Sequence, residues 1–287
     1  MRDSGFHPFK GRVSRHFGET LGPDAPYLSY FDIRLMKEDM DTLKNDWLTD
    51  NSISFWEEYL EREYLNQYKN AHIVLLRPSM SFMLMQTPDP LTLKEALPNF
   101  SRTTHIFLPI NDCRNPSIAE GGSHWSLLLV SVVDGVAFHY DSLNPANRSE
   151  AGLAARKIGQ LLGRQLQFID LTDSPQQENS SDCGVFVCIQ MRHLLLRKLL
   201  MAHAKEKISM SMGGKSVDAT QGRKEMLRII EGFRKEGERR RSVVTLVLRI
   251  AKSVISTILL RLLHLNVECA GQRNWARRSA FAAASAE

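Results

Sequence analysis

The sequence predicts an α+β fold. Short apolar runs typical of strands lie in the middle of the chain, and segments with a helical spacing of apolar residues come before, between and after them. The chain has 287 residues, of which 43% are hydrophobic. That is enough to fill the core of one large domain or two small ones.

Strand-like runs occupy residues 104–110, 124–133, 135–142 and 166–171. Asp134-Gly135 separates the second run from the third and is typical of a two-residue β-hairpin turn. We therefore expect these two strands to pair in antiparallel fashion. The start of the first would then lie next to the end of the second.

Helices are predicted for four segments, which cover residues 27–68, 149–162, 184–200 and 222–241. Within the first segment Ile53, Trp56 and Leu60 share one face, and Ser52 or Asn51 is expected to cap the helix.

Composition divides the chain into three parts. Residues 1–26 are rich in Gly, Pro and His and are expected to form a loosely ordered lead, whereas residues 27–241 carry the predicted elements of one domain. Residues 242–287 form a basic and apolar C-terminal extension of unknown role. Its apolar stretch is interrupted by Arg249, Lys252 and Arg261. Each charge would cost about 2.5–3.5 kcal/mol at the centre of a bilayer, so we expect no membrane partner.

The positive charge is confined to the C-terminal extension and the few residues before it. From Arg239 onward lie nine of the 37 Lys and Arg residues but only two of the 32 Asp and Glu residues. Residues 1–238 therefore have a net charge of −2, which fits poorly with binding to a phosphate backbone, and we expect no nucleic-acid partner.

Four cysteines without a CxxC pair indicate neither a disulfide framework nor a zinc site. The first residues contain no apolar stretch typical of a secretory signal. We therefore expect a reducing compartment, the cytoplasm and/or the nucleus, and no metal or organic cofactor.

Cys183 stands where a polar run, "QQENSSD", meets the apolar segment 184–200. The start of a predicted helix offers unpaired N–H groups and a dipole that favour a thiolate. Gly184 is expected to leave room beside the sulfur for a substrate carbonyl. We therefore interpret Cys183 as a catalytic nucleophile.

His124 and Asp141 are the matching candidates for base and orienting acid. His124 lies where a Gly-Gly loop enters one strand, and Asp141 ends the next, so the predicted hairpin makes them neighbours. Asp141 would hold one imidazole nitrogen and support the imidazolium. Gln177, six residues before the cysteine, could donate to an oxyanion together with the Cys183 N–H.

Each of these residues also has a purely structural interpretation. Cysteines in apolar runs are usually core residues, which is how we interpret Cys188, and Asp141 or Gln177 could simply end a strand or solvate a loop. Only the four residues together indicate nucleophilic catalysis.

The motifs "GGSHWSLLLV", "FHYDS" and "PQQENSSDCGVFVC", with the upstream "DWLTDNSISFWEEYL", resemble the ubiquitin-like-protein-specific cysteine proteases, the sentrin-specific protease family. The resemblance covers about residues 27–241 and implies a cysteine-protease-like fold. In it a mixed central sheet is packed by helices, and the nucleophile lies at the N-terminus of a central helix. "YLSYFDIRL", "FLPIND" and "GGSHWSLL" are most similar to the deneddylase branch, since SUMO-directed members more typically have HWCLAV at the last point.

By position, the resemblance makes His124, Asp141 and Cys183 the catalytic residues and Gln177 the oxyanion glutamine. It matches Trp47 and Trp125 to aromatic residues that cover the Gly-Gly end of the substrate, and Asp50 to an acidic residue at the rim. Thr49 replaces the usual Asn of that motif, and Trp47 could instead anchor its helix in the core.

The resemblance implies a cysteine-type isopeptidase and processing hydrolase. It would cleave after the C-terminal Gly-Gly of a ubiquitin-like modifier, most simply the neddylation modifier that is attached to cullins. Its partners would be the modifier and its conjugates. A SUMO- or ubiquitin-directed protease, a module that binds a modifier without cleaving it, and an acetyltransferase with related Cys-His chemistry remain alternatives.

Overall fold

The structure is a computed structural model that describes residues 22–115, 117, 121–202, 208–243, 245, 248, 249, 252 and 255. Of the predicted lead, residues 1–26, the first 21 residues lie outside the described ranges. Most of the predicted C-terminal extension, residues 242–287, also lies outside them. The chain contains two compact units, Met1–Glu231 and Gly232–Glu287. The first unit holds all the labelled strands and helices, and the predicted α+β class is confirmed.

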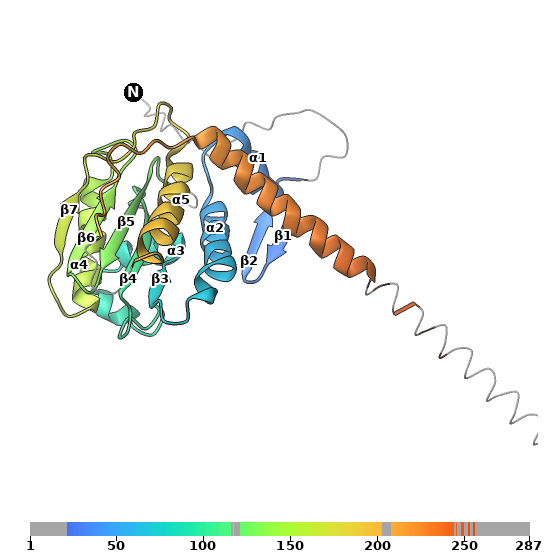
Figure 1. Cartoon of the computed structure of the whole chain (residues 1–287), viewed down its shortest axis with the longest axis horizontal. Coiled ribbons are helices and arrows are strands. Elements are labelled where there is room, and N and C mark those ends of the chain that lie inside the picture. The colour runs from blue at the N-terminus through green and yellow to red at the C-terminus, as the bar shows by residue number, and fades with distance from the viewer. Residues whose placement is uncertain are drawn as a thin grey trace, which may run out of the picture. The chain divides into compact units, whose positions relative to one another are not determined.

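The centre of the first unit is a five-stranded mixed sheet in the order β3-β4-β5-β6-β7 (Figure 1). The outer pairs β3/β4 and β6/β7 are parallel, and the inner pairs are antiparallel. The strands are β3 (Ile73–Leu75), β4 (His105–Asn111), β5 (Trp125–Ser131), β6 (Val136–Tyr140) and β7 (Gln167–Asp170). All four strand-like runs of the sequence thus form strands.

Helices cover both faces of this sheet, which explains why every residue of β5 is buried. On one face α3 and α4 enclose a core that includes Ile106, Leu128 and Ile158. On the other face α5 packs on β5 with α2 beside it (Figure 1). The helices are α2 (Asp50–Glu63), α3 (Pro78–Gln86), α4 (Arg148–Leu161) and α5 (Cys183–His193). Two short 3-10 segments are η1 (Leu65–Gln67) and η2 (Pro90–Leu93), and the π-helical η3 (Leu194–Leu199) continues α5.

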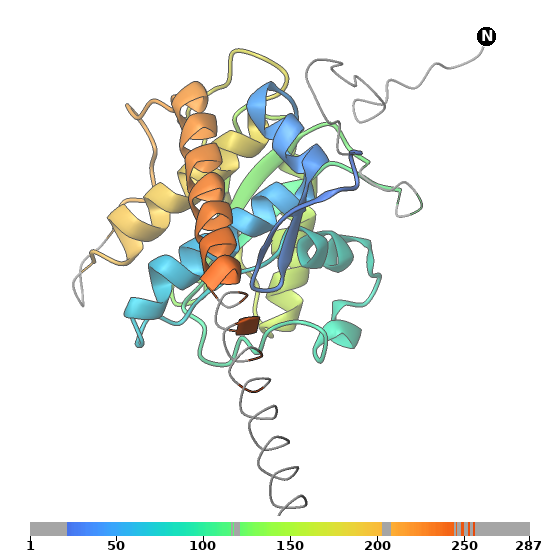
Figure 2. The ribbon, with the colours of Figure 1, turned by 90° about the vertical axis from the view of Figure 1, so that its right-hand side faces the viewer.

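The first predicted helix is wrong over its N-terminal part. Residues there form the antiparallel hairpin of β1 (Pro26–Tyr30) and β2 (Ile33–Met36), and α1 (Lys37–Asn45) follows. The turn contains Phe31 with φ of +49°, a conformation that no glycine signals in the sequence. The hairpin packs on α2 (Figure 2), where the Tyr30 ring meets the Phe55 ring edge-on at 5.5 Å.

Two local expectations also need correction. The cap of α2 is Thr49, whose side chain accepts the N–H of Ser52 at 3.2 Å, and not Ser52 or Asn51. The β5–β6 hairpin is confirmed, but its loop spans residues 132–135 and not only Asp134-Gly135, because the last pair of the ladder joins Ser131 to Val136.

A helical segment, residues 219–231, completes the first unit. Ala219, Met226 and Ile230 are buried at a helical spacing, and Ile230 is the last buried residue in the described part of the chain. In the second unit, residues 232–243 are also helical. No helix in the described ranges has the length and apolar character needed to cross a membrane.

We predict that a chain ending at Arg241 unfolds within about 2 °C of the full chain, because every buried residue described lies before that point. A chain ending at Val217 should lose on the order of 10 °C, since it loses the buried Met226 and Ile230. Thermal unfolding followed by circular dichroism measures both. Equal melting temperatures for the two truncated chains would contradict this account of the core.

Candidate active site

His124 and Asp141 meet at one edge of the sheet. The β5/β6 register pairs Leu127 with Tyr140, so His124 lies just before β5 and Asp141 just after β6. His124 Nε2 lies 2.6 Å from Asp141 Oδ1, and both side chains are buried. The proximity predicted from the hairpin is confirmed.

Asp141 is held as a carboxylate by donors on three sides. Oδ1 also accepts the N–H of Leu143 at 2.9 Å, and Oδ2 accepts the N–H of Asn147 at 2.9 Å. Burial alone would raise the pKa of Asp141, but the hydrogen bonds from His124 and from these backbone groups lower it below the ordinary value. The residue is therefore a fixed anion behind the imidazole.

The backbone of His124 is fixed by Asp112 and Asn147. The Asp112 carboxylate accepts the N–H of His124 at 3.0 Å, and Asn147 Nδ2 donates to the His124 carbonyl at 3.2 Å. Gly122 precedes them with φ of +91°, where a Cβ would lie 2.1 Å from Asn111 Oδ1. Gly122 is the second glycine of the Gly-Gly pair before His124. Its backbone conformation and its close contact with Asn111 require a glycine just before β5.

The electrostatics of His124 favour the imidazolium. Burial lowers the pKa of the ring, but the hydrogen bonds to Asp141 and to the Cys183 sulfur, together with their charges, raise it to about 9. Since Nε2 is bonded to Asp141, Nδ1 is the nitrogen left for the sulfur. The His124 ring can therefore hold a proton beside the Cys183 sulfur at neutral pH.

Cys183 is the first residue of α5, as expected, and is fully buried. Its sulfur therefore lies at the N-terminus of the helix, where N–H groups without intrahelical partners and the helix dipole stabilise an anion. Cys188, one turn further on, is also buried, and burial raises the pKa of its thiol well above the usual value. That shift fits the structural interpretation of Cys188.

The explanation offered for Gly184 is wrong. A Cβ at this position would lie 2.8 Å from the Cβ of Leu48. The space beside the glycine is occupied by Leu48, which is itself fully buried. Glycine is needed so that the start of α5 can approach the loop that carries Trp47.

Gln177 is anchored beside the end of β6. Its N–H donates to the Ser142 carbonyl at 2.8 Å, and its Oε1 accepts the Ser142 hydroxyl at 2.7 Å. Nε2 donates to the carbonyl of Asn179 at 2.5 Å. An amide NH₂ has two donors, and Asn179 is the one acceptor found for it in the described part of the chain.

The three predicted substrate-binding residues differ in their surroundings. Trp125, the first residue of β5, is 3% exposed, and its Nε1 has no hydrogen-bond partner among the described residues. Trp47 is half-buried in the loop between α1 and α2. Asp50 is exposed in the first turn of α2, and no hydrogen bond joins it to the other predicted site residues in the described ranges.

Sequence reasoning missed Asp112 and Asn147, which hold His124 and Asp141 from the backbone side. An Asp two residues before Arg114 or an Asn before a helix is common in loops, so residue type alone does not mark them. Only their hydrogen bonds show the role.

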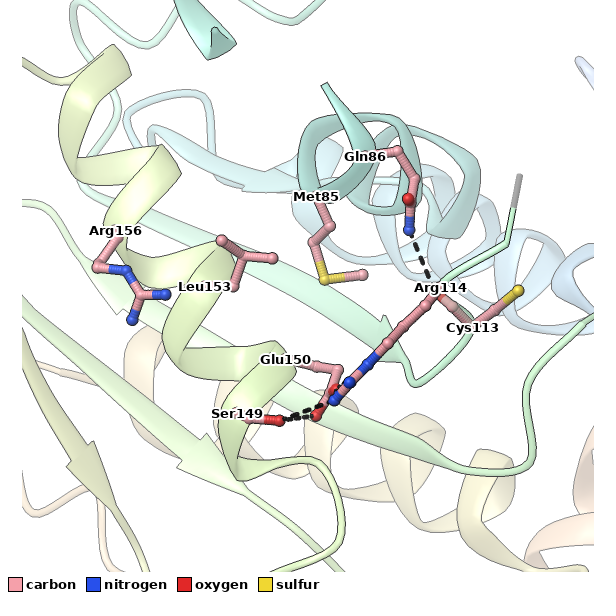
Figure 3. A pocket seen from close by; sticks show the side chains of 8 residues that line it. All are labelled: Met85, Gln86, Cys113, Arg114, Ser149, Glu150, Leu153 and Arg156. Atoms are coloured by element: carbon pink, nitrogen blue, oxygen red, sulfur yellow. Dashed lines mark hydrogen bonds and ion pairs between the residues drawn. The ribbon is translucent and has the colours of Figure 1, made fainter. Parts of the chain in front are cut away.

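A cavity of about 270 Å³ is lined by side chains of α3, α4 and the residues after β4 (Figure 3). None of the seven predicted residues lines it, and the candidate site is defined by hydrogen bonds around His124. The lining residues are Met85, Gln86, Cys113, Arg114, Ser149, Glu150, Leu153 and Arg156. The described residues contain no cluster of three or more His, Cys, Asp or Glu side chains suited to a metal ion.

An α+β fold with a cysteine at the start of a central helix, facing a His–Asp pair on the adjacent sheet edge, is the architecture of a cysteine peptidase. The profile of the Ulp1 protease family, C-terminal catalytic domain, matches residues 46–210. The match covers more than half of the chain, which therefore belongs to this family. The resemblance seen in the sequence motifs is confirmed.

Several relatives and a solved structure are similar to this chain. NEDD8-specific protease 2 of Schizosaccharomyces pombe is 37% identical over 209 residues, which cover 71% of this chain and 50% of that protein. NEDD8-specific protease 1 of Arabidopsis thaliana is 32% identical over 173 residues, 59% of this chain and 75% of that protein. The chain spans about half the length of the Schizosaccharomyces pombe relatives that it matches.

The solved structure is the C-terminal Ulp1 protease domain in complex with Smt3, the yeast ortholog of SUMO. It aligns with a TM-score of 0.55 at 18% identity and covers 78% of this chain and 99% of that one. At this identity the likeness concerns the fold.

We predict that peptidase activity falls on the alkaline side near pH 9, where the His124 imidazolium loses its proton. In Asp141→Asn the fall should move to lower pH, because the carboxylate that raises the pKa is gone. The pH profile of kcat/KM measures this. An unchanged alkaline limb in Asp141→Asn would contradict the assigned pairing.

Gly184→Ala should destabilise the protein by about 1–3 kcal/mol, because the new methyl group overlaps Leu48. The matched control is Gly152→Ala inside α4, where the Cβ would meet only Arg156 Nη1 at 3.7 Å. The control should be neutral or stabilising by up to about 1 kcal/mol. Urea denaturation compares them, and equal stability of the two variants would refute the close approach.

Proposed function

We propose that the chain is a cysteine-type isopeptidase and processing hydrolase that cleaves after the C-terminal Gly-Gly of NEDD8. The observation that carries the proposal is the 37% identity to NEDD8-specific protease 2 over 209 residues. The interactions of His124 with Asp141 and with Cys183 in this chain also support the proposal. The catalytic domain we propose is 27–241, which contains the family match at 46–210.

The proposed mechanism begins with transfer of the Cys183 proton to His124 Nδ1. The thiolate then attacks the carbonyl carbon of the terminal glycine and forms a tetrahedral oxyanion. As the oxyanion collapses, the C–N bond breaks and the imidazolium gives its proton to the departing amine. This leaves a thioester on the sulfur.

Water completes the cycle in the second half-reaction. His124 accepts a proton from the water as the water oxygen attacks the thioester carbon. The tetrahedral adduct collapses with cleavage of the C–S bond, and the modifier leaves as a carboxylic acid that ionises to solvent. The proton held by His124 returns to the sulfur. Asp141 keeps its charge throughout and stabilises the imidazolium, a role consistent with its lowered pKa.

The oxyanion would be bound by the backbone N–H of Cys183 and by the second N–H of the Gln177 amide. The bonds of Gln177 to Ser142 and Asn179 fix the orientation of that amide. Such pre-arranged donors contribute on the order of 10²–10³ in rate each.

Trp47 and Trp125 are proposed to enclose the Gly-Gly tail, with Asp50 at the rim. A narrow channel between two indole rings accepts residues without side chains, which fits a Gly-Gly end. In this proposal Trp125 Nε1, which is buried and has no hydrogen-bond partner among the described residues, donates to the peptide backbone of the tail. Leu48 packing on Gly184 supports this geometry, because it brings the Trp47 loop against the nucleophile helix.

The physiological partners we propose are NEDD8 and its conjugates, with cullins as the expected targets. The proposed location is the cytoplasm and/or the nucleus, where such conjugates occur. No cofactor is required by the proposed reaction.

We predict rapid release of a C-terminal fluorogenic amide from NEDD8, and at least 100-fold slower release from SUMO and ubiquitin. Cys183→Ala should abolish release, because no nucleophile remains. Initial rates on the three substrates give the comparison.

The remaining outcomes separate the alternatives. Preference for SUMO would keep the mechanism and overturn the substrate. Tight binding of a modifier without release by the unmutated chain would replace the hydrolase by a recognition module.

A further inference from the structure

Arg223 lies outside the matched family segment, which ends at residue 210, and yet it reaches the site. It belongs to the helical residues 219–231 and is 5% exposed. A guanidinium has five N–H donors, and all five are used here. The acceptors are Asp182 Oδ1, bonded twice, and the carbonyls of Thr42, Leu43 and Ser181, at 2.8–3.2 Å.

The first group of contacts lies directly before the nucleophile. Asp182 is the N-cap residue of α5, and Cys183 is the next residue. The other carboxylate oxygen of Asp182 accepts Asn179 Nδ2 at 2.9 Å, while the Asn179 carbonyl accepts Gln177 Nε2. Arg223 therefore holds the end of a hydrogen-bonded chain that reaches the proposed oxyanion glutamine.

The second group of contacts lies before the Trp47 loop. Thr42 and Leu43 belong to the last turn of α1, and Arg223 Nη1 donates to both of their carbonyls at 3.2 Å. The Thr42 carbonyl also accepts the N–H of Asp46 at 2.8 Å. Trp47 follows Leu43 by four residues. One side chain thus joins the loop on one side of the proposed channel to the helix that carries the sulfur.

The two groups are held together by charge as well as geometry. The Asp182 carboxylate and a Cys183 thiolate are anions at the same helix N-terminus, and like charges at short range disfavour each other. The Arg223 guanidinium, 2.8 Å from Asp182 Oδ1, offsets the carboxylate. The N–H donors of Arg223 are all used by these other acceptors, so it acts on the carboxylate and not directly on the sulfur.

We propose that Arg223 is a positioning residue of the active site. It fixes the Trp47 loop against the N-terminus of α5 and compensates the Asp182 charge beside the nucleophile. The roles of Trp47 and Cys183 in this inference rest on the proposed function.

The experiment uses the full chain and four single variants, Arg223→Gln, Arg223→Lys, Asp182→Asn and Glu225→Gln, with the double variant Arg223→Gln/Asp182→Asn. Glu225 is the matched control, because its 2.7 Å ion pair with Arg192 joins the same two helices away from the sulfur. Three measurements are made on each variant. They are the melting temperature, the rate at which iodoacetamide alkylates Cys183 at pH 7, followed by the mass of the peptide that contains it, and kcat and KM for the modifier with a C-terminal fluorogenic amide.

Arg223→Gln should slow alkylation on the order of tenfold, because an uncompensated Asp182 opposes the thiolate. The double variant should recover to within about threefold of the unmutated chain, since the opposing charge is then removed. A merely structural loss would not be rescued in this way, as the bonds to Thr42, Leu43 and Ser181 remain broken. Glu225→Gln should leave alkylation, kcat and KM unchanged within about twofold.

Arg223→Lys tests the geometry if the glutamine variant does not fold. An ammonium keeps the charge on Asp182 but cannot reproduce the planar five-donor fork. Alkylation should stay within about twofold, while KM rises roughly fivefold because the Trp47 loop is released.

The inference is overturned if Arg223→Gln lowers only the melting temperature, if Asp182→Asn brings no rescue, or if Arg223→Lys leaves KM unchanged. Alkylation needs no modifier, so its result stands even if the proposed NEDD8 substrate is wrong.

Discussion

The pairing of β5 with β6 is the constraint on which the candidate site depends. It sets Leu127 opposite Tyr140, and this brings His124 and Asp141 within 2.6 Å although they are 17 residues apart in sequence. A slip of one residue would turn every side chain of one strand to the opposite face. Both faces of β5 are buried, so such a slip would repack every side chain of the strand against α4 and α5. The packing of the core thereby fixes the geometry of the acid and the base.

The nucleophile enters this arrangement through a second constraint, the close contact of α5 with the α1–α2 loop. Gly184 allows Leu48 to lie against the start of the helix, and Leu48 is continuous with Trp47. Cys183 at the start of α5, the His124–Asp141 pair at the sheet edge and the Trp47 indole therefore come from different parts of the chain. Buried apolar contacts hold each of these parts in place. Short hydrogen bonds then fix the polar groups where the parts meet.

The sequence predicted those parts of the fold whose signals are local. Runs such as "HWSLLLVSVV" indicate strands by composition, and a hairpin of two such runs is sufficient to predict that His124 lies beside Asp141. The β1–β2 hairpin could not be found in this way, because its turn uses Phe31 at φ of +49° and its strands are stabilised by contact with α2. The expectation of free space beside Gly184 was wrong because it too depends on a contact that is distant in sequence. The neighbour that fills it, Leu48, is 136 residues away in sequence, and the pattern around the glycine contains no sign of it.

Arg223 lies beyond the family match at 46–210 but inside the compact unit Met1–Glu231. In the sequence it stands among charged residues, "GRKEMLRIIEG", a pattern typical of an exposed helical face. Burying a guanidinium without partners would cost several kcal/mol, so its position is stable only because five acceptor contacts are supplied by α1 and by the residues before α5. Two of those acceptors are carbonyls in the last turn of α1, and the others are the Ser181 carbonyl and the Asp182 carboxylate just before α5. The residues 219–231 and the two segments around Cys183 therefore provide donors and acceptors for each other. The compact unit Met1–Glu231 extends beyond the end of the family match at residue 210, and Ile230 is its last buried residue in the described ranges.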